Sequence, residues 1–295
     1  MGSNSILAGI GATVLAVTLL VCGFAVCCLP GVTTSLAGTV STGETSPYTH
    51  DQLVELAGVT RAFTVDQHRD AEAAAEDVAA AVVDAARAAS AEGAPKAGEW
   101  TDAARRALDA PGTSLDAMDA LAKVSDRYAL DGAAVSHLED CNRLITGVSS
   151  WLGMIGVAAL VVGVLLGVRR QWAALAFMLR MGPALLLALL AVLGLWGVVD
   201  FNGLFAAFHS LFFVDGTWTF SYDSLLISMY PLDFWMGMGG VWLATSVGLG
   251  AACFIGGCVA AWRAQVQARE LRDAAEAAAR KGKGKGKGKG KKGKR

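Results

Sequence analysis

Two of the four histidines in this chain stand where an imidazole is suited to proton transfer. His137 begins the run His137-Leu138-Glu139-Asp140-Cys141, which directly precedes an apolar stretch. If this run is helical, Asp140 and Cys141 share a face with His137, because residues three and four apart are neighbours on a helix. A carboxylate one turn away is placed to orient the imidazole. The spacing therefore predicts an oriented histidine just before an apolar helix.

His209 lies in a different setting, an aromatic segment at residues 200–234 that separates two further apolar stretches. Seven phenylalanines fall within this segment, together with Trp218 and two tyrosines. Amphipathic rings are favoured at the boundary between lipid and water. We therefore expect the segment to lie at the depth of lipid headgroups.

An imidazole has an ordinary pKa of about 6.5, which suits general acid–base catalysis near neutral pH. Two such groups at a lipid–water boundary, beside Asp140 and aromatic walls, predict proton transfer on a lipid ester. For either histidine alone, the alternative is a boundary residue that makes one structural hydrogen bond. His50 and His68 stand in a polar stretch, and we expect both to be solvated surface residues.

Several other kinds of site have no support in the sequence. There is no GxSxG of a serine hydrolase, and no P-loop or GxGxxG with the strand and helix that nucleotide binding requires. No cysteine or histidine spacing is typical of a metal site, so we expect neither a metal nor a cofactor. Five of the six cysteines lie in apolar runs and Cys141 stands alone in the polar part, which predicts no structural disulfide there.

The composition indicates the elements that position these residues. Hydrophobic residues make up 54% of the 295 residues and the mean hydropathy is +0.46, which is too apolar for an ordinary soluble domain. A helix that crosses a membrane needs about 20 apolar residues. The stretches that qualify are residues 6–29, 144–168, 172–199 and 234–262. The predicted fold class is all-α, a polytopic membrane protein with four transmembrane helices and an extracytoplasmic helical insertion between the first and second.

Orientation follows from the basic residues at the ends of the spans. The loop after the second span carries Arg169, Arg170 and Arg180 without an acid, and the tail after the fourth span is strongly basic. Both are predicted to be cytoplasmic, which places both termini in the cytoplasm. The spans carry almost no charge, and this disfavours a transport function.

The predicted organisation has four parts. These are a first transmembrane anchor at residues 1–29, an extracytoplasmic acidic helical domain at 30–143, a three-span membrane domain at 144–262 with an aromatic external loop at 200–234, and a cytoplasmic basic disordered tail at 263–295. From residue 30 to 145 there are 19 acidic and 9 basic residues, whereas from 263 onward there are 3 acidic and 13 basic residues. Good helix formers dominate the acidic domain. We expect the Lys-Gly run at the end to contact anionic lipid headgroups, and we expect no specific nucleic-acid partner.

The two histidine segments resemble a family of bacterial integral membrane proteins that includes the lipoprotein intramolecular transacylase. The residues that carry this resemblance are the run from His137 to Asp140 before the second span and the longer pattern Phe208-His209-Ser210-Leu211-Phe212-Phe213, Trp218-Thr219-Phe220, Asp223, Leu226-Ile227 and Tyr230-Pro231-Leu232-Asp233-Phe234-Trp235. The four-span layout is also similar. The resemblance implies a multi-pass protein of the bacterial plasma membrane, with membrane lipids and diacylated lipoproteins as partners.

The activity that the resemblance implies is an intramolecular acyl transfer at the outer face of the membrane. The sn-2 acyl chain of a diacylglyceryl lipoprotein would move to the amine of its N-terminal cysteine. The implied catalytic residues are His137, His209 and Asp140, with His137 as base and His209 as acid or oxyanion donor, or with these roles exchanged. The implied substrate-binding residues are Phe208, Phe212, Phe213, Trp218, Tyr230 and Trp235.

The alternative hypothesis is a non-catalytic protein of the cell envelope whose external helical domain docks a partner. The two hypotheses differ in what they require of the histidines. Catalysis requires the imidazoles to approach within about one water molecule of each other, whereas docking allows them to lie far apart.

Overall fold

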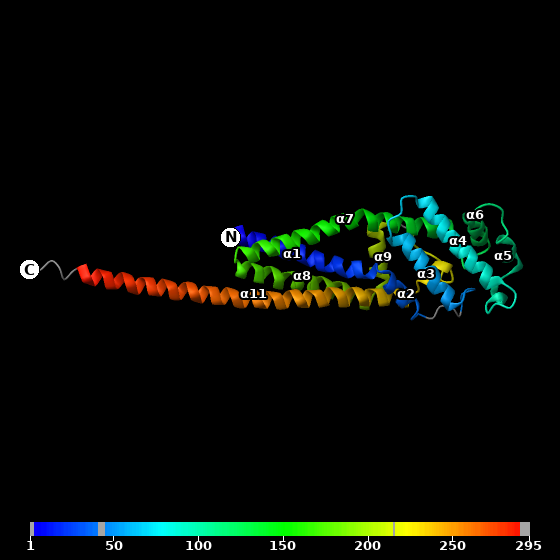
Figure 1. The fold of residues 1–295 in the computed structure, drawn as a ribbon. Coiled ribbons are helices and arrows are strands. Elements are labelled where there is room, and N and C mark those ends of the chain that lie inside the picture. Colours follow the sequence, from blue (N-terminus) through cyan, green and yellow to red (C-terminus); the bar gives the residue numbers. More distant parts are fainter. Residues whose placement is uncertain (1–2, 41–44, 215, 290–295) are drawn as a thin grey trace, which may run out of the picture. The chain divides into compact units, whose positions relative to one another are not determined.

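A computed structural model of the chain describes residues 3–40, 45–214 and 216–289, and their regular secondary structure is helical throughout (Figure 1). The elements are α1 (Ser3–Cys27), α2 (Pro30–Ala37), α3 (His50–Val65), α4 (Ala71–Ser90), the 3₁₀ turn η1 (Ala97–Glu99), α5 (Asp102–Ala107), α6 (Ser114–Val124), α7 (Gly132–Val168), α8 (Trp172–Val199), α9 (Phe201–Phe212), α10 (Leu225–Met229) and α11 (Leu232–Lys289). No strand occurs in the described ranges, which confirms the predicted all-α class.

Four of the described helices are long and apolar enough to cross a membrane, as the sequence predicted. They contain the segments Ser5–Cys27, Gly132–Val168, Trp172–Val199 and Leu232–Lys281. With 37 residues, α7 is about 55 Å long at 1.5 Å per residue, whereas the hydrocarbon core is about 30 Å thick. Its polar first turns, residues 132–143, therefore precede the membrane-spanning part, which starts at about residue 144.

The chain divides into two compact units. One comprises Met1–Leu19, Ile155–Ala188 and Val247–Arg295, and the other comprises Leu20–Met154 and Leu189–Ser246. The first unit is made of parts of α1, α7, α8 and α11. The second contains the remaining parts of these helices together with α2 to α6, α9 and α10.

In the first unit, small residues let α1 and α8 approach closely. A side chain added at Gly182 would meet Leu15 at 2.9 Å and the carbonyl oxygen of Ala12 at 3.1 Å. A side chain added at Gly11 would meet the sulfur of Met178 at 2.8 Å. Close backbone approach through small residues is the usual way in which membrane helices gain contact, since lipid supplies no hydrophobic drive for helix association.

In the second unit, the acidic stretch folds into a helical domain with its own core. Helices α3 and α4 lie side by side in it (Figure 1). The largest side chains of its core that are fully buried include Tyr48, Leu56, Val82, Val83, Leu121, Leu130, Leu225 and Met229. The last two come from α10, so the final part of the aromatic segment belongs to the same core.

Tyr230 fixes the position of this segment by hydrogen bonds as well as by burial. Its hydroxyl group donates to the carbonyl oxygen of Ala57, 2.8 Å away, and lies 2.8 Å from the hydroxyl oxygen of Thr60. The backbone N–H of Leu225 donates to the carbonyl oxygen of Asp126 at 2.8 Å. Residues 225–230 are thus held at both ends by the helical domain.

Arg61 of α3 joins the same domain to the end of α1. Its Nε donates to the carbonyl oxygen of Cys28 at 3.0 Å, and Nη1 donates to the two carboxylate oxygens of Asp66 at 2.8 and 2.7 Å. The last carbonyl groups of a helix have no partner within the helix, and a buried guanidinium satisfies one of them here. Only 10% of the Arg61 side chain is exposed.

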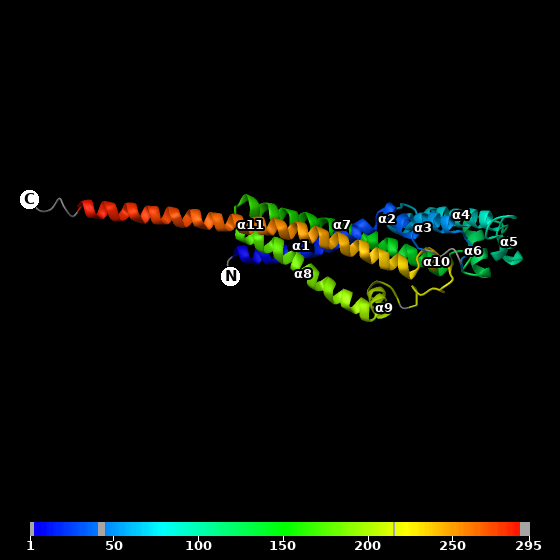
Figure 2. The ribbon, with the colours of Figure 1, turned by 90° about the horizontal axis from the view of Figure 1, so that it is seen from below.

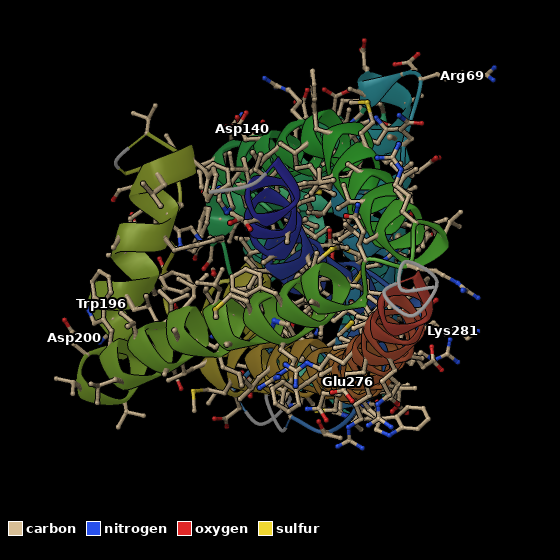
Figure 3. The ribbon with its side chains drawn as sticks, turned by 90° about the vertical axis from the view of Figure 1, so that its left-hand side faces the viewer. Arg69, Asp140, Trp196, Asp200, Glu276 and Lys281 are labelled. Carbon is tan, nitrogen blue, oxygen red and sulfur yellow. The ribbon has the colours of Figure 1, made fainter. Side chains whose placement is uncertain are left out.

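Helix α11 continues well beyond the predicted membrane segment. The sequence predicted a disordered tail at residues 263–295, but the structure describes helix as far as Lys289. Figure 3 shows Glu276 and Lys281 on this continuation. Residues 263–280 are rich in alanine, arginine and glutamate, which have high helix propensity and let the helix extend past its apolar part. Residues 290–295 of the predicted tail lie outside the described range.

Replacing Arg61 with methionine should destabilise the helical domain by about 2–3 kcal/mol, because the change leaves a buried carbonyl group without its donor and Asp66 without its partner. The thermal unfolding midpoint in detergent should fall by several degrees. The control is Arg87→Met, because Arg87 pairs with Asp84 on the surface of α4 with 57% of its side chain exposed and such pairs contribute little. Equal midpoints for the two variants would contradict the role given to Arg61.

Candidate active site

Each of the two helices that carry the candidate histidines begins at an aspartate whose side chain caps its first turn. The carboxylate of Asp131 accepts from the backbone N–H of Ala134 at 2.7 Å, where α7 begins about one and a half turns before His137. The carboxylate of Asp200 accepts from Gly203 at 2.8 Å and starts α9, which carries His209 in its third turn. Such caps satisfy N–H groups that the first turn of a helix leaves free.

Asp200 also ends α8, and at this point the chain changes direction. Helix α9 runs across the direction of the α8 end (Figures 1 and 2). Figure 3 shows Trp196 and Asp200 at this corner. The cap therefore does more than start a helix, because it sets the turn that brings His209 back toward α7.

The two imidazoles face each other in the second unit. Their ring centroids lie 6.2 Å apart with an angle of 30° between the ring planes. This separation meets the condition that catalysis places on the pair, an approach within about one water molecule.

Aromatic rings surround the pair. Phe213 lies 4.8 Å from the ring of His137 and 5.8 Å from that of His209. Phe205 and Trp218 lie 4.0 and 4.8 Å from His209, and Phe220 lies 5.6 Å from His137. Phe205 and Phe220 were not among the predicted site residues, although the position of Phe205 one turn before His209 was a usable signal.

The hydrogen bonds of His209 decide which of its nitrogens carries the proton. Its Nδ1 lies 2.8 Å from the carbonyl oxygen of Phe205. A carbonyl oxygen can only accept, so Nδ1 is the protonated nitrogen. In the neutral ring Nε2 is then left with a free lone pair, which makes it an acceptor.

In His137 the nitrogen that has a partner is Nε2 and not Nδ1. Its Nε2 lies 3.7 Å from the sulfur of Cys141, and its Nδ1 is buried without a hydrogen-bond partner in the described part of the chain. Burial raises the pKa of the Cys141 thiol to about 12, so the S–H group is intact, and because sulfur is only a weak acceptor we assign the thiol as the donor to Nε2. The proton of neutral His137 is therefore on Nδ1, where it is available as a donor.

Both imidazoles are held in the neutral form. Burial lowers the pKa of His137, and the nearby His209 lowers it further, while Asp140 acts in the opposite direction. Burial also lowers the pKa of His209, opposed by its hydrogen bond to Phe205. An apolar wall disfavours the charged form of each ring, which keeps both rings uncharged near pH 7.

Asp140 has a position other than the one the spacing suggested. Its carboxylate lies 3.4 Å from the guanidinium of Arg143, and 39% of its side chain is exposed. Figure 3 shows it at the surface of α7. The described residues include no hydrogen bond between Asp140 and His137, and Cys141 occupies that place instead. Asp140 acts on His137 through its charge only.

The other predicted substrate-binding residues fall into two groups. Phe208 touches His209 with a centroid separation of 5.6 Å, and the exposed Phe212 packs on Phe208 and Phe213. Tyr230 and Trp235 are not brought to the imidazoles. Tyr230 is buried against α3, and the indole N–H of Trp235 donates to the carbonyl oxygen of Tyr230 at 3.1 Å.

Trp218 contributes a polar group to the site. Its indole Nε1 is buried and has no hydrogen-bond partner among the described residues. Buried N–H groups are nearly always paired in folded proteins. An unpaired one beside His209 is a donor available to a ligand.

Part of the chain matches a known protein family. The family model of the lipoprotein intramolecular transacylase Lit matches residues 114–235, a range that contains both histidines and the aromatic wall. The match covers less than half of the chain. The resemblance expected from the two histidine segments is thus confirmed.

A solved relative supports the fold. The in meso structure of the membrane integral lipoprotein intramolecular transacylase Lit from Bacillus cereus matches with a TM-score of 0.56 and 13% identity, covering 91% of this chain and 98% of that one. No curated protein sequence matches the chain. The region that matches the family model therefore lies within a chain whose fold is similar to that structure over most of its length.

Replacing Phe213 with alanine should raise the pKa of both imidazoles toward 6.5, because water then reaches the rings and stabilises their charged forms. In the unchanged protein both rings should stay neutral until the pH falls below 6.5. Titration of ¹⁵N-labelled histidine side chains by NMR measures this. Phe212→Ala is the control, since Phe212 contacts neither imidazole closely. An imidazole pKa above 6.5 in the unchanged protein would rule out the neutral pair.

Proposed function

We propose that this chain is an intramolecular acyltransferase of the membrane. It moves the sn-2 acyl chain of a diacylglyceryl lipoprotein to the amine of the lipoprotein's N-terminal cysteine. The observation that carries this proposal is the pair of neutral imidazoles 6.2 Å apart with complementary nitrogens, an acceptor on His209 and a donor on His137. The match of residues 114–235 to the transacylase family supports the choice of substrate.

The chemistry needs one base and one donor. The attacking amine has a pKa of about 8, so its neutral form is accessible near pH 7. As the amine nitrogen bonds to the acyl carbon, Nε2 of His209 takes one proton from it. The bond from the acyl carbon to the sn-2 oxygen then breaks, and that oxygen receives the proton held on Nε2 of His209, which returns this ring to its neutral form. The net result is an amide, a free sn-2 hydroxyl and no change in proton number.

The hydrogen bonds favour the second of the two role assignments that the sequence left open. His209 is the base, because its Nε2 has the free lone pair. His137 is the hydrogen-bond donor to the oxyanion, because its Nδ1 carries the proton and its Nε2 accepts from Cys141. Asp140 is given no positioning role, since its carboxylate pairs with Arg143.

Trp218 completes the proposed site. A tetrahedral intermediate places negative charge on the former carbonyl oxygen, and preorganised donors stabilise it most effectively where water is excluded. The indole N–H of Trp218 and Nδ1–H of His137 are the two unpaired donors of the site. Phe205, Phe213 and Phe220 supply the dry walls. Because amine and ester belong to one molecule, positioning removes a further part of the barrier.

The sidedness of the protein is also part of the proposal. The basic residues at the α7–α8 turn and along the end of α11 favour a cytoplasmic location for both termini. The acidic helical domain at residues 30–143 and the site then face outward, where lipoproteins reside. The Lys-Gly run is proposed to contact anionic headgroups at the inner face.

His137→Asn and His209→Asn should each lower the formation of lyso-form lipoprotein by a factor of about 100 or more, the usual contribution of a general acid or base. Mass spectrometry of lipoprotein N-termini measures this in cells that lack other N-acylation activity. His50→Asn is the matched control, because His50 lies at the start of α3. Unchanged lipoproteins in cells that contain the folded protein would instead favour the docking function.

Trp218→Phe should keep the ring and remove the donor, so kcat should fall about 100- to 1000-fold while KM changes little. Trp235→Phe is the control, because that indole already donates to a backbone carbonyl group. Kinetics with purified protein and a synthetic diacylglyceryl peptide separate the two parameters. A change confined to KM would mean that Trp218 binds substrate without stabilising the intermediate.

A further inference from the structure

The first unit has a groove whose lining residues take no part in the proposed site. It has a volume of about 210 Å³, and its lining includes Arg170 and Trp172 at the α7–α8 turn and Trp262, Arg263 and Glu270 on α11. Taking about 30 Å³ per water molecule, this is room for about seven waters. The groove is large enough for a small polar headgroup.

The lining residues stand at the ends of apolar segments. Helix α7 ends at Val168 and α8 begins at Trp172, so Arg170 lies in the turn between two membrane-spanning helices. Arg263 is the first charged residue after the apolar part of α11. Trp262 is 62% exposed and Val168 is 77% exposed. Such positions are at the depth of lipid headgroups, where tryptophan and arginine are favoured.

The backbone at Arg170 is unusual. Its φ is +52°, and it is the one non-glycine residue with positive φ among the described residues. The N–H of Gln171 donates to Leu166 at 2.9 Å, which closes the kind of helix end where glycine is the usual residue. A strained backbone conformation at a non-glycine residue is typical of functional positions, which indicates a function for the side chain of Arg170.

The charged side chains that line the groove leave it with a net positive charge. The guanidinium of Arg263 stacks on Trp172, 4.9 Å from the ring centroid. Neither Arg170 nor Arg263 forms an ion pair with another described residue. Glu270 offsets one of the two positive charges, and Arg169 adds another beside the groove.

We propose that this groove binds the phosphodiester of an anionic phospholipid headgroup. Arginine is suited to it, because its planar fork binds phosphate oxygens in pairs and is less strongly hydrated than an ammonium group. Trp172 and Trp262 pack on the glyceryl region of the bound lipid. The exposed apolar side chains that precede them, such as Val168, lie along its acyl chains. This site is separate from the Lys-Gly run, whose charges are not fixed around a groove.

The test is thermal unfolding of the purified full chain in detergent, with added phosphatidylglycerol, phosphatidylcholine or soluble glycerol phosphate. Phosphatidylglycerol should raise the midpoint. In the double variant Arg170→Gln/Arg263→Gln, the apparent affinity should fall about tenfold or more. The control is Arg272→Gln/Arg280→Gln, which removes equal charge further along α11. This control should retain the affinity.

Three results would overturn the proposal. Equal loss in the two double variants would mean diffuse attraction to positive charge, and an equal rise with phosphatidylcholine would mean that anionic charge is not recognised. An equal rise with glycerol phosphate would mean that a soluble phosphate is recognised and not a lipid. If the groove variant does not fold, Glu270→Gln tests the same site by removing a negative charge in place of the two positive charges. It should bind phosphatidylglycerol more tightly, and unchanged or weaker binding would contradict the site.

Discussion

The packing of residues 225–234 into the helical domain is the constraint on which the proposed site depends. The hydroxyl group of Tyr230 reaches Ala57 and Thr60 on α3, and Leu225 and Met229 are completely buried beside it. These contacts fix the far end of the aromatic segment, whose near end is set by the Asp200 cap. Trp218 and Phe220 lie between two fixed points, which limits the conformations available to the loop. The acidic domain is therefore part of the architecture of the site as well as a surface for contacts.

The second constraint is electrostatic. A histidine pair in water would be partly charged at neutral pH, and two charged rings at this separation would repel each other. Burial by Phe205, Phe213 and Phe220 keeps both rings neutral with the proton on Nδ1, and the backbone carbonyl of Phe205 and the thiol of Cys141 occupy different nitrogens of the two rings. One ring is left as an acceptor and the other as a donor. A single type of side chain thus supplies two different functions, because the local partners differ.

The two compact units use arginine in different ways. Arg61 is buried and satisfies the end of α1, and it would be costly to remove because a carbonyl group would lose its donor. Arg170 and Arg263 are exposed at a groove and form no ion pair with another described residue, so an anion can reach them. The first arrangement stabilises the fold, whereas the second leaves positive charge available for a lipid.

The sequence by itself determined the four spans, the two histidine segments and the family resemblance. Hydrophobic length and the spacing of residues on one helix are local properties, and they are preserved in any fold that keeps the helices. The partners of His137, the tautomers and the placement of Tyr230 and Trp235 were decided only by the tertiary structure. Helical spacing put both Asp140 and Cys141 beside His137, but the side-chain conformations and the competing Arg143 decided between them. Tyr230 belongs to the aromatic motif in the sequence, yet its hydroxyl group required buried partners, and α3 offered them away from the imidazoles.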